Sequence, residues 1–238
     1  MYFFKGDLSM FTDQAHATTK ACWDASKRHP FIQQLQAGTL PLATFRYYLI
    51  QDHYYLKEFG AIHDLAADQS DDPLVAKQLH AGAEHLRQGE VAIRQEFFDR
   101  LKITPAEVAA TPVAPTGYAY TSHLYRELLT HGPAGAVAGL LPCYWLYAEI
   151  GQSLAHQGSP VPIYQAWIDT YNADDYTGSM TDQLALANHV ATQENTPQLL
   201  AAFEKSSWYE LNFWQMALDH EDWSLPETAV ASDFSTSR

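Results

Sequence analysis

Apolar residues recur at spacings of three and four along most of the chain, which is the period of α-helices with one buried face. A capping residue precedes a proline at Asp72-Pro73, Thr104-Pro105 and Thr196-Pro197, an order typical of helix starts. The usual hairpin dipeptides Asn-Gly and Asp-Gly are absent. The pattern therefore predicts an all-α protein, with helices over residues 8–28, 41–69, 73–101, 105–110, 117–130, 133–157, 161–172, 180–193 and 197–220.

Three of these apolar faces carry a chemically active side chain: Asp52, Cys143 and Glu210. Their neighbours at helical spacing are mostly apolar or aromatic: Phe45, Tyr48, Leu49, Tyr55, Leu56 and Phe59 around Asp52; Ala136, Leu140, Tyr147, Ile150 and Leu154 around Cys143; Phe203, Ser207, Phe213, Trp214 and Ala217 around Glu210. An uncompensated carboxylate in a dry core costs on the order of tens of kcal/mol. Both carboxyl groups must therefore be paired, protonated, hydrated or beside a ligand cavity, and the last two possibilities favour a pocket.

Each of these residues also has an ordinary explanation. A lone cysteine on a helix is usually a small buried hydrophobe, and an inward carboxylate often has a tyrosine or backbone partner. Aromatic residues at helical spacing are usually core. The combination on three separate helices favours a shared pocket.

The composition fits one domain. Of the 238 residues, 47% are hydrophobic, which is enough for one substantial core. We expect a single helical domain over residues 1–223, followed by a C-terminal tail over residues 224–238. This tail is rich in Ser, Thr and Ala, and we expect it to be mobile or an added segment.

The charge and the cysteines restrict partners and compartment. With 28 Asp and Glu against 14 Lys and Arg, the formal net charge is −14, which repels nucleic acids and anionic membranes. The first ten residues lack a secretory signal, and the most apolar run, Ala134 to Ala148, is shorter than the ~18 residues of a membrane span. Cys22 and Cys143 form no CxxC pair, so a reducing cytoplasm is expected.

Residues 127–204 contain no Lys or Arg. A basic sequence neighbour that would activate Cys143 is therefore absent, and a carboxylate base or protonation of the substrate is the expected route. We expect a neutral or cationic ligand that engages the inward carboxylates directly, in the absence of an arginine partner.

Metal-binding patterns are weak. HExxH and Glu-x-x-His do not occur, which argues against a zinc peptidase helix and a di-iron bundle. His80, Glu84 and His85 could approach one metal, but a solvated helix face is the favoured explanation. We expect neither a metal nor a cofactor.

Five stretches resemble the TenA, or thiaminase II, family of aminopyrimidine aminohydrolases, in its cysteine-containing branch. They are HPFIQQLQAGTLPLATFRYYLIQDHYYL (29–56), AYTSHLY (119–125), GLLPCYWLYAEIG (139–151), WIDTYNADDY (167–176) and SSWYELNFWQMA (206–217). The resemblance covers about residues 8–220. It implies a heme-oxygenase-like helical fold that binds no heme, usually as a homotetramer. It also implies hydrolysis of 4-amino-5-aminomethyl-2-methylpyrimidine to the hydroxymethyl pyrimidine in thiamin salvage, with cleavage of thiamin as a related activity.

The resemblance also implies roles for particular residues. It identifies Cys143 as the nucleophile, Glu210 as the acid/base and Asp52 as the residue that holds the pyrimidine. The implied pocket aromatics are Tyr55, Tyr120, Tyr147, Tyr171 and Phe213. A 4-aminopyrimidine suits such a site, because a carboxylate can engage its amidine-like edge and tyrosines can stack on its face.

Two other functions stay open at this point. One is a non-catalytic pyrimidine-binding or regulatory protein, and the other is a redox or metal enzyme on the same fold. The choice between degraded pyrimidines and intact thiamin also stays open, because it depends on pocket volume.

Overall fold

The computed structural model describes residues 9–223, apart from the side chains of residues 89–93 and 175. Helices joined by short connections make up this part of the chain. The elements are α1 (Phe11–Lys27), α2 (Pro30–Ala37), α3 (Leu42–Asp68), α4 (Pro73–His85), the π-helical turn η1 (Leu86–Glu90), α5 (Val91–Leu101), α6 (Pro105–Ala110), α7 (Pro115–Leu154), α8 (Pro162–Thr170), α9 (Asp174–Val190) and α10 (Thr196–Asp219). The predicted all-α class is confirmed. The predicted tail over residues 224–238 lies outside the described residues.

Helix α2 is the element that the sequence pattern missed. Its ends carry clear signals: the His29 side chain accepts a hydrogen bond from the Phe31 amide, Pro30 occupies the first turn, and Gly38 ends the helix at a φ of 74°. At eight residues it has only about two turns, which is shorter than the ~11 residues over which helical periodicity is recognised.

Two predicted boundaries also changed. The predicted helix over residues 73–101 is divided into α4 and α5 by η1, and α9 begins at Asp174 rather than at residue 180. A π-helical turn adds a residue to one turn, so it shifts the face that the following helix presents.

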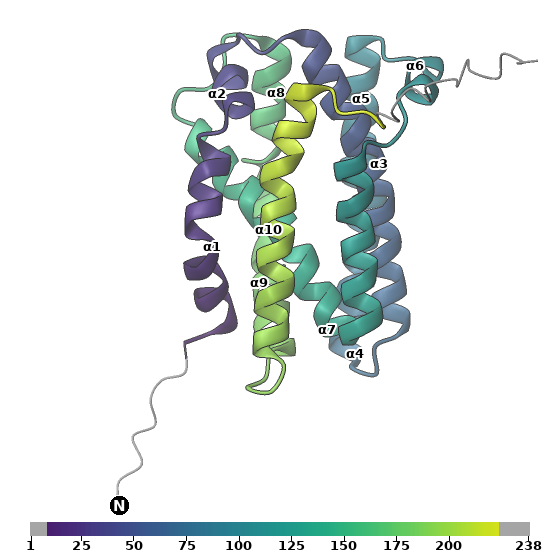
Figure 1. The fold of residues 1–238 in the computed structure, drawn as a ribbon, viewed down its shortest axis with the longest axis vertical. Helices are drawn as coiled ribbons and strands as arrows, with labels where there is room; N and C mark the ends of the chain where they lie inside the picture. Colours follow the sequence, from purple (N-terminus) through teal and green to yellow (C-terminus); the bar gives the residue numbers. More distant parts are fainter. Residues whose placement is uncertain (1–8, 224–238) are drawn as a thin grey trace, which may run out of the picture.

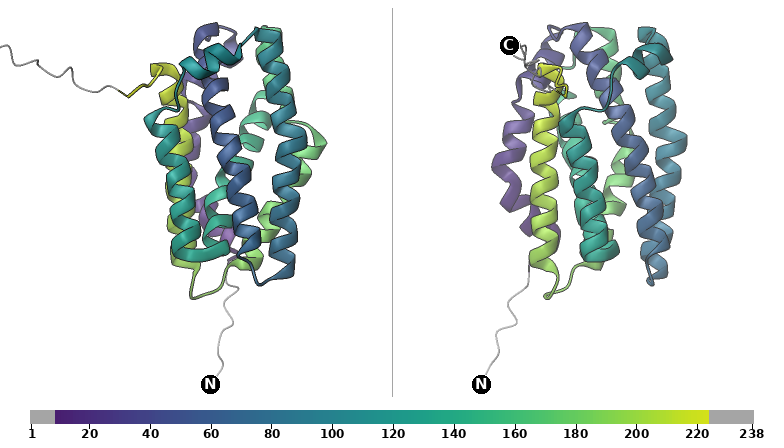
Figure 2. Two further views of the ribbon diagram at one scale, coloured as in Figure 1. Left: turned by 90° about the vertical axis from the view of Figure 1, so that its right-hand side faces the viewer. Right: turned by 45° about the vertical axis from the view of Figure 1, so that its right-hand side comes forward.

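The long helices run side by side, while α2, α6 and α8 gather at one end of the bundle (Figure 1). Helix α10 packs along α7 and α1, and α3 packs against α4 and α7. Figure 2 shows α3 beside the α4–α5 segment in two further views. None of the helices in residues 9–223 is both long and apolar enough to cross a bilayer.

Trp214 on α10 lies at the centre of the core and is fully buried. Its ring contacts Phe31 of α2, Tyr48 of α3 and Tyr147 of α7, at centroid distances of 5.3, 5.7 and 5.1 Å. Aromatic pairs of this kind add about 0.5–1.5 kcal/mol each beyond the area that they bury. The cluster therefore joins four helices around one side chain.

Gly132 divides α7 into two parts. Its φ of 65° and ψ of −161° lie in a region that only glycine adopts readily, and Pro133 follows it. Tyr120 and Cys143 lie 23 residues apart on this helix, which would be about 35 Å along an unbroken α-helix. The break at Gly132 lets the second half of α7 return across the bundle.

Gly151, near the end of α7, allows a close approach of the segment after α8. A Cβ atom at this position would lie 2.8 Å from the Cβ of Tyr171 and 2.9 Å from its carbonyl oxygen. The absence of a side chain therefore sets where Tyr171 lies.

Gly151→Ala should lower the free energy of unfolding by about 1–3 kcal/mol, because backbone atoms of residue 171 must shift to accommodate the methyl group. Gly178→Ala is the matched control on α9, where a new Cβ meets no heavy atom within 4 Å. This control should be as stable as the parent protein or more so, since alanine favours helices over glycine by about 1 kcal/mol. Chemical denaturation measures both, and equal midpoints for the two variants would contradict the explanation.

Candidate functional site

The structure brings sequence-predicted site residues from several helices into contact in the core. They come from four elements: Asp52 and Tyr55 on α3; Tyr120, Cys143 and Tyr147 on α7; Tyr171 directly after α8; and Glu210 and Phe213 on α10. All are buried except Cys143, which is half-buried. The apolar faces predicted for Asp52, Cys143 and Glu210 do point inward.

Aromatic rings connect the members of this group. The Tyr55 ring lies 4.9 Å from Tyr120 and 5.9 Å from Phe213, and Tyr147 lies 4.9 Å from Tyr171. The Tyr147 and Tyr48 hydroxyl oxygens are 3.4 Å apart. The rings exclude water around the polar groups and so strengthen the electrostatic interactions there.

Glu210 is buried in the middle of α10 and accepts a 2.7 Å hydrogen bond from the Tyr120 hydroxyl. Burial raises the pKa of Glu210 to about 8, while the Tyr120 hydrogen bond opposes the rise and the nearby Asp52 adds to it. A carboxyl group with such a pKa can both donate and accept a proton near neutral pH. The tyrosine partner that would explain an inward carboxylate is therefore present. Its hydrogen bond also lowers the pKa of Glu210.

Asp52 forms an ion pair with Arg94 of α5. The expectation that the inward carboxylates lack an arginine partner is therefore wrong for Asp52. Burial raises the pKa of Asp52, and the guanidinium opposes that rise. Burial lowers the pKa of Arg94, but Asp52, Tyr171 and Tyr48 together more than offset this and raise it overall.

The sequence contained a signal for Arg94. With Phe97, Phe98 and Leu101 it follows the same spacing of three and four that identified Asp52, and both phenylalanines are buried. An arginine on an apolar face is a candidate partner for an inward aspartate, because each makes the other less costly to bury.

Beyond the effect of burial, Cys143 and Glu210 both raise the pKa values of the same two tyrosines, Tyr55 and Tyr120. Burial raises the pKa values of Tyr55 and Tyr120 well above their usual range, and Cys143 and Glu210 add to both shifts. The Tyr176 hydroxyl donates a 3.4 Å hydrogen bond to the Cys143 carbonyl oxygen. The thiol, the carboxylic acid and two protonated tyrosines thus share one region.

Tyr48 and Tyr176 are further site neighbours that the residue-by-residue resemblance did not include. Tyr48 contacts Tyr147, and burial followed by the charge of Asp52 raises its pKa above the usual range. Tyr48 was already on the apolar face around Asp52, so its spacing was a usable signal.

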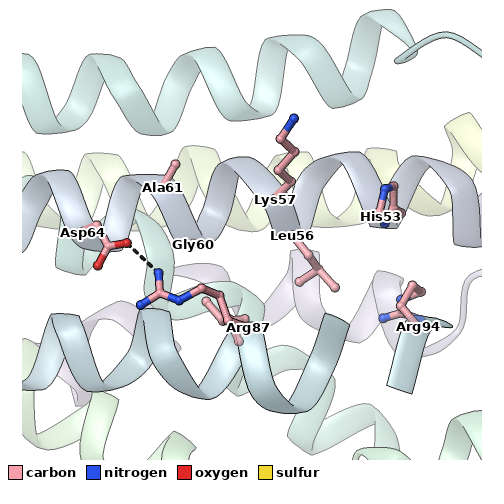
Figure 3. Close-up of a pocket in the computed structure, with 9 residues that line it drawn as sticks. His53, Leu56, Lys57, Gly60, Ala61, Asp64, Arg87 and Arg94 are labelled. Atoms are coloured by element: carbon pink, nitrogen blue, oxygen red, sulfur yellow. Dashed lines mark hydrogen bonds and ion pairs between the residues drawn. The ribbon is translucent and has the colours of Figure 1, made fainter. Parts of the chain in front are cut away.

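A cavity of about 340 Å³ lies on the flank of α3, beside the Asp52–Arg94 pair. Its lining residues are His53, Leu56, Lys57, Gly60, Ala61, Asp64, Leu86, Arg87 and Arg94. Figure 3 shows Arg87 turned toward Asp64, with a 2.7 Å hydrogen bond, while Arg94 lies opposite His53. Arg94 therefore both lines this cavity and pairs with Asp52 of the candidate site.

The candidate metal residues have other partners. His80 lies 3.1 Å from Asp64, and Glu84 pairs with Arg87. Within the described residues, no group of three or more His, Cys, Asp or Glu side chains is arranged to hold a metal ion.

Comparisons with known proteins agree with the helical fold. Residues 16–220 match the family described as TENA/THI-4/PQQC. An aminopyrimidine aminohydrolase of Bacillus subtilis (strain 168) is 37% identical over 217 residues, which is 90% of this chain and 92% of that protein. The solved structure of a TenA homologue from P. horikoshii OT3 is 26% identical, superposes with a TM-score of 0.83, and covers 89% of this chain and 99% of its own.

A domain of unknown function from Shewanella denitrificans OS217 with a heme-oxygenase-like fold has a TM-score of 0.69 at 14% identity, over 90% of this chain and 94% of its own. At that identity the likeness concerns the fold alone. The expected heme-oxygenase-like architecture and the resemblance to the TenA family are confirmed.

Glu210→Gln should make unfolding less sensitive to pH. The folded protein keeps Glu210 protonated up to a pH of about 8, whereas its ordinary pKa is 4.5, so stability falls as pH rises through this range. Relative to the parent protein, the variant should gain on the order of a few kcal/mol between about pH 5 and pH 9. Denaturant titrations at both pH values measure this, with Glu204→Gln on the exposed face of α10 as control. A parallel change in both variants would contradict the assignment.

Proposed function

Because the chain belongs to the TENA/THI-4/PQQC family, we propose that it is an aminopyrimidine aminohydrolase that converts 4-amino-5-aminomethyl-2-methylpyrimidine and water into the hydroxymethyl pyrimidine and ammonia. The observation that carries the proposal is the buried, protonated Glu210 beside the region of Cys143, with ionisable Asp52 on the facing helix. The relatives named aminopyrimidine aminohydrolase support it.

Asp52 binds the pyrimidine in this proposal. A carboxylate oxygen accepts a hydrogen bond from the exocyclic amine. The ring nitrogen next to the amine-bearing carbon donates a second hydrogen bond to the carboxylate when this nitrogen is protonated. Tyr147 and Tyr171 flank the ring. Their high degree of burial restricts their motion, so little side-chain entropy is lost when the ligand binds.

Cys143 then supplies the nucleophile. Its sulfur forms a bond to the ring carbon adjacent to the one that bears the aminomethyl group, while the thiol proton moves to a ring nitrogen that takes up the electron pair of the broken ring double bond. When that electron pair returns toward the exocyclic carbon, the carbon–nitrogen bond breaks. The amine leaves as ammonia after receiving a proton from Glu210.

Glu210 completes the cycle as a base. It takes a proton from water, whose oxygen bonds to the exocyclic methylene carbon, and the carbon–sulfur bond breaks as the ring-nitrogen proton returns to the sulfur of Cys143. The net reaction consumes one water and releases one ammonia. In thiaminase activity, the thiazole takes the place of ammonia as the leaving group. The family resemblance also supports a cytoplasmic homotetramer, and sedimentation measures the subunit number.

Cys143→Ser should abolish ammonia release, and Glu210→Gln should lower kcat by about 10² to 10⁴-fold, the usual contribution of a positioned acid/base. The measurement is ammonia production with product identification, for the aminomethyl pyrimidine and for thiamin. Cys22→Ser is the control, since Cys22 is the other cysteine of the chain and donates to the Ser207 carbonyl. Near-normal turnover by a folded Cys143→Ser variant would rule out the covalent route. Tight pyrimidine binding without turnover in the parent protein would favour a binding protein instead.

Tyr120→Phe should move the basic limb of the kcat/KM profile to higher pH. The limb belongs to Glu210, whose pKa of about 8 is lowered by the hydrogen bond from Tyr120, so loss of that bond raises it further. Rates from about pH 6 to 10 test the shift. Tyr209→Phe is the control, because Tyr209 stacks on Tyr120 at 5.2 Å and keeps its ring in the variant. A basic limb that stays at the same pH in Tyr120→Phe would assign it to another group.

A further inference from the structure

Arg94 is the buried cation of the candidate site. Its side chain is 3% exposed and reaches from α5 to Asp52, which is 4% exposed. Among the described side chains, Arg94 is the one that forms an ion pair with Asp52. Arg94 also hydrogen bonds with Tyr171, so both of these contacts are with residues of the candidate site.

A purely structural role explains this arginine poorly. A buried ion pair is often no more stable than an apolar pair of the same size, because desolvation offsets the attraction. A guanidinium retained for structure is usually surrounded by acceptors, yet the buried Nε of Arg94 has no hydrogen-bond partner among the described residues. Besides the Phe97 ring on its own helix, Arg94 contacts Asp52 of the candidate site through their ion pair.

Among the described residues, the groups that face Asp52 from the surrounding helices offer no other cation. They are Tyr48 on α3, Tyr147 on α7 and Glu210 on α10, and Arg94 on α5 is the positive charge. Without that charge, a carboxyl group buried among tyrosines and a second carboxyl would hold its proton to higher pH. A protonated carboxyl group still accepts from the exocyclic amine of a 4-aminopyrimidine, but it has lost the negative charge that stabilises the protonated ring nitrogen beside that amine.

We propose that Arg94 is the positioning residue for aminopyrimidine binding: it contacts Asp52 Oδ2, keeps the carboxylate ionised, and leaves Oδ1 as the acceptor for the amidine-like edge of the ligand. The inference rests on the proposed function, since it concerns the same substrate and the same aspartate. Arg94 acts through Asp52 and takes no part in bond breaking.

Arg94→Met removes the charge and keeps an unbranched apolar side chain. It should raise KM for the aminomethyl pyrimidine, and Kd for the hydroxymethyl product, about tenfold or more, with a smaller change in kcat. The loss of binding should grow as pH falls, because Asp52 without the guanidinium becomes protonated at a higher pH than in the parent protein. Arg94→Lys keeps the charge but not the planar donor geometry, and should recover part of the affinity. Arg87→Gln is the matched control, since Arg87 lines the same cavity but pairs with Asp64.

A double-mutant cycle separates positioning from general stability. In an Asp52→Asn background, Arg94→Met should change the Kd of the hydroxymethyl pyrimidine less than twofold, because the group through which Arg94 acts is gone. The double variant also removes both charges, so it should fold even if Arg94→Met alone does not. Isothermal titration measures all four affinities, and circular dichroism checks folding.

Two results would overturn the inference while the proposed function survives: unchanged Kd and an unchanged pH profile in folded Arg94→Met, or an equal loss of affinity in the Asp52→Asn background. If the parent protein binds neither the aminomethyl nor the hydroxymethyl pyrimidine, the proposed function itself fails.

Discussion

The desolvation of two carboxyl groups is the constraint on which the rest of this structure depends. Asp52 and Glu210 lie on the inward faces of long helices, where water cannot stabilise a charge. The protein meets this cost in two ways. Asp52 pairs with a buried guanidinium, and Glu210 keeps its proton and accepts a hydrogen bond from Tyr120. One carboxyl group is therefore suited to bind a ligand, and the other to exchange a proton.

The tyrosines around these groups follow from the same constraint. Burial raises the pKa values of Tyr55, Tyr120 and Tyr147 well above their usual range, so all three hydroxyls stay protonated and can donate hydrogen bonds. The Tyr55 and Tyr120 rings also pack against each other, and the Tyr147 ring packs against Trp214. The same side chains that form the core therefore hold the polar groups in place, which is why the candidate site has little freedom to relax.

Two glycines allow the elements to meet. Gly132 breaks α7, so that Cys143 in the second part of this helix acts on Tyr120 in the first part. Gly151 lets the backbone after α8 approach α7 closely enough to bring Tyr171 against Tyr147. Neither glycine carries chemistry, yet the arrangement around Cys143 depends on both, because no larger residue fits these backbone positions without strain.

The sequence by itself determined the helical class and the inward direction of Asp52, Cys143 and Glu210, because a helical period assigns every residue to a face. Its motifs also indicated the family. The period cannot say which faces meet, and therefore the partner of Asp52 was missed: Arg94 is distant in sequence, and the π-helical turn before α5 shifts its register. The pKa of Glu210 likewise required the tertiary structure, since it depends on the exclusion of water by several helices at once. Spacing is a local property of the chain, whereas burial, pairing and proton affinity are properties of the assembled core.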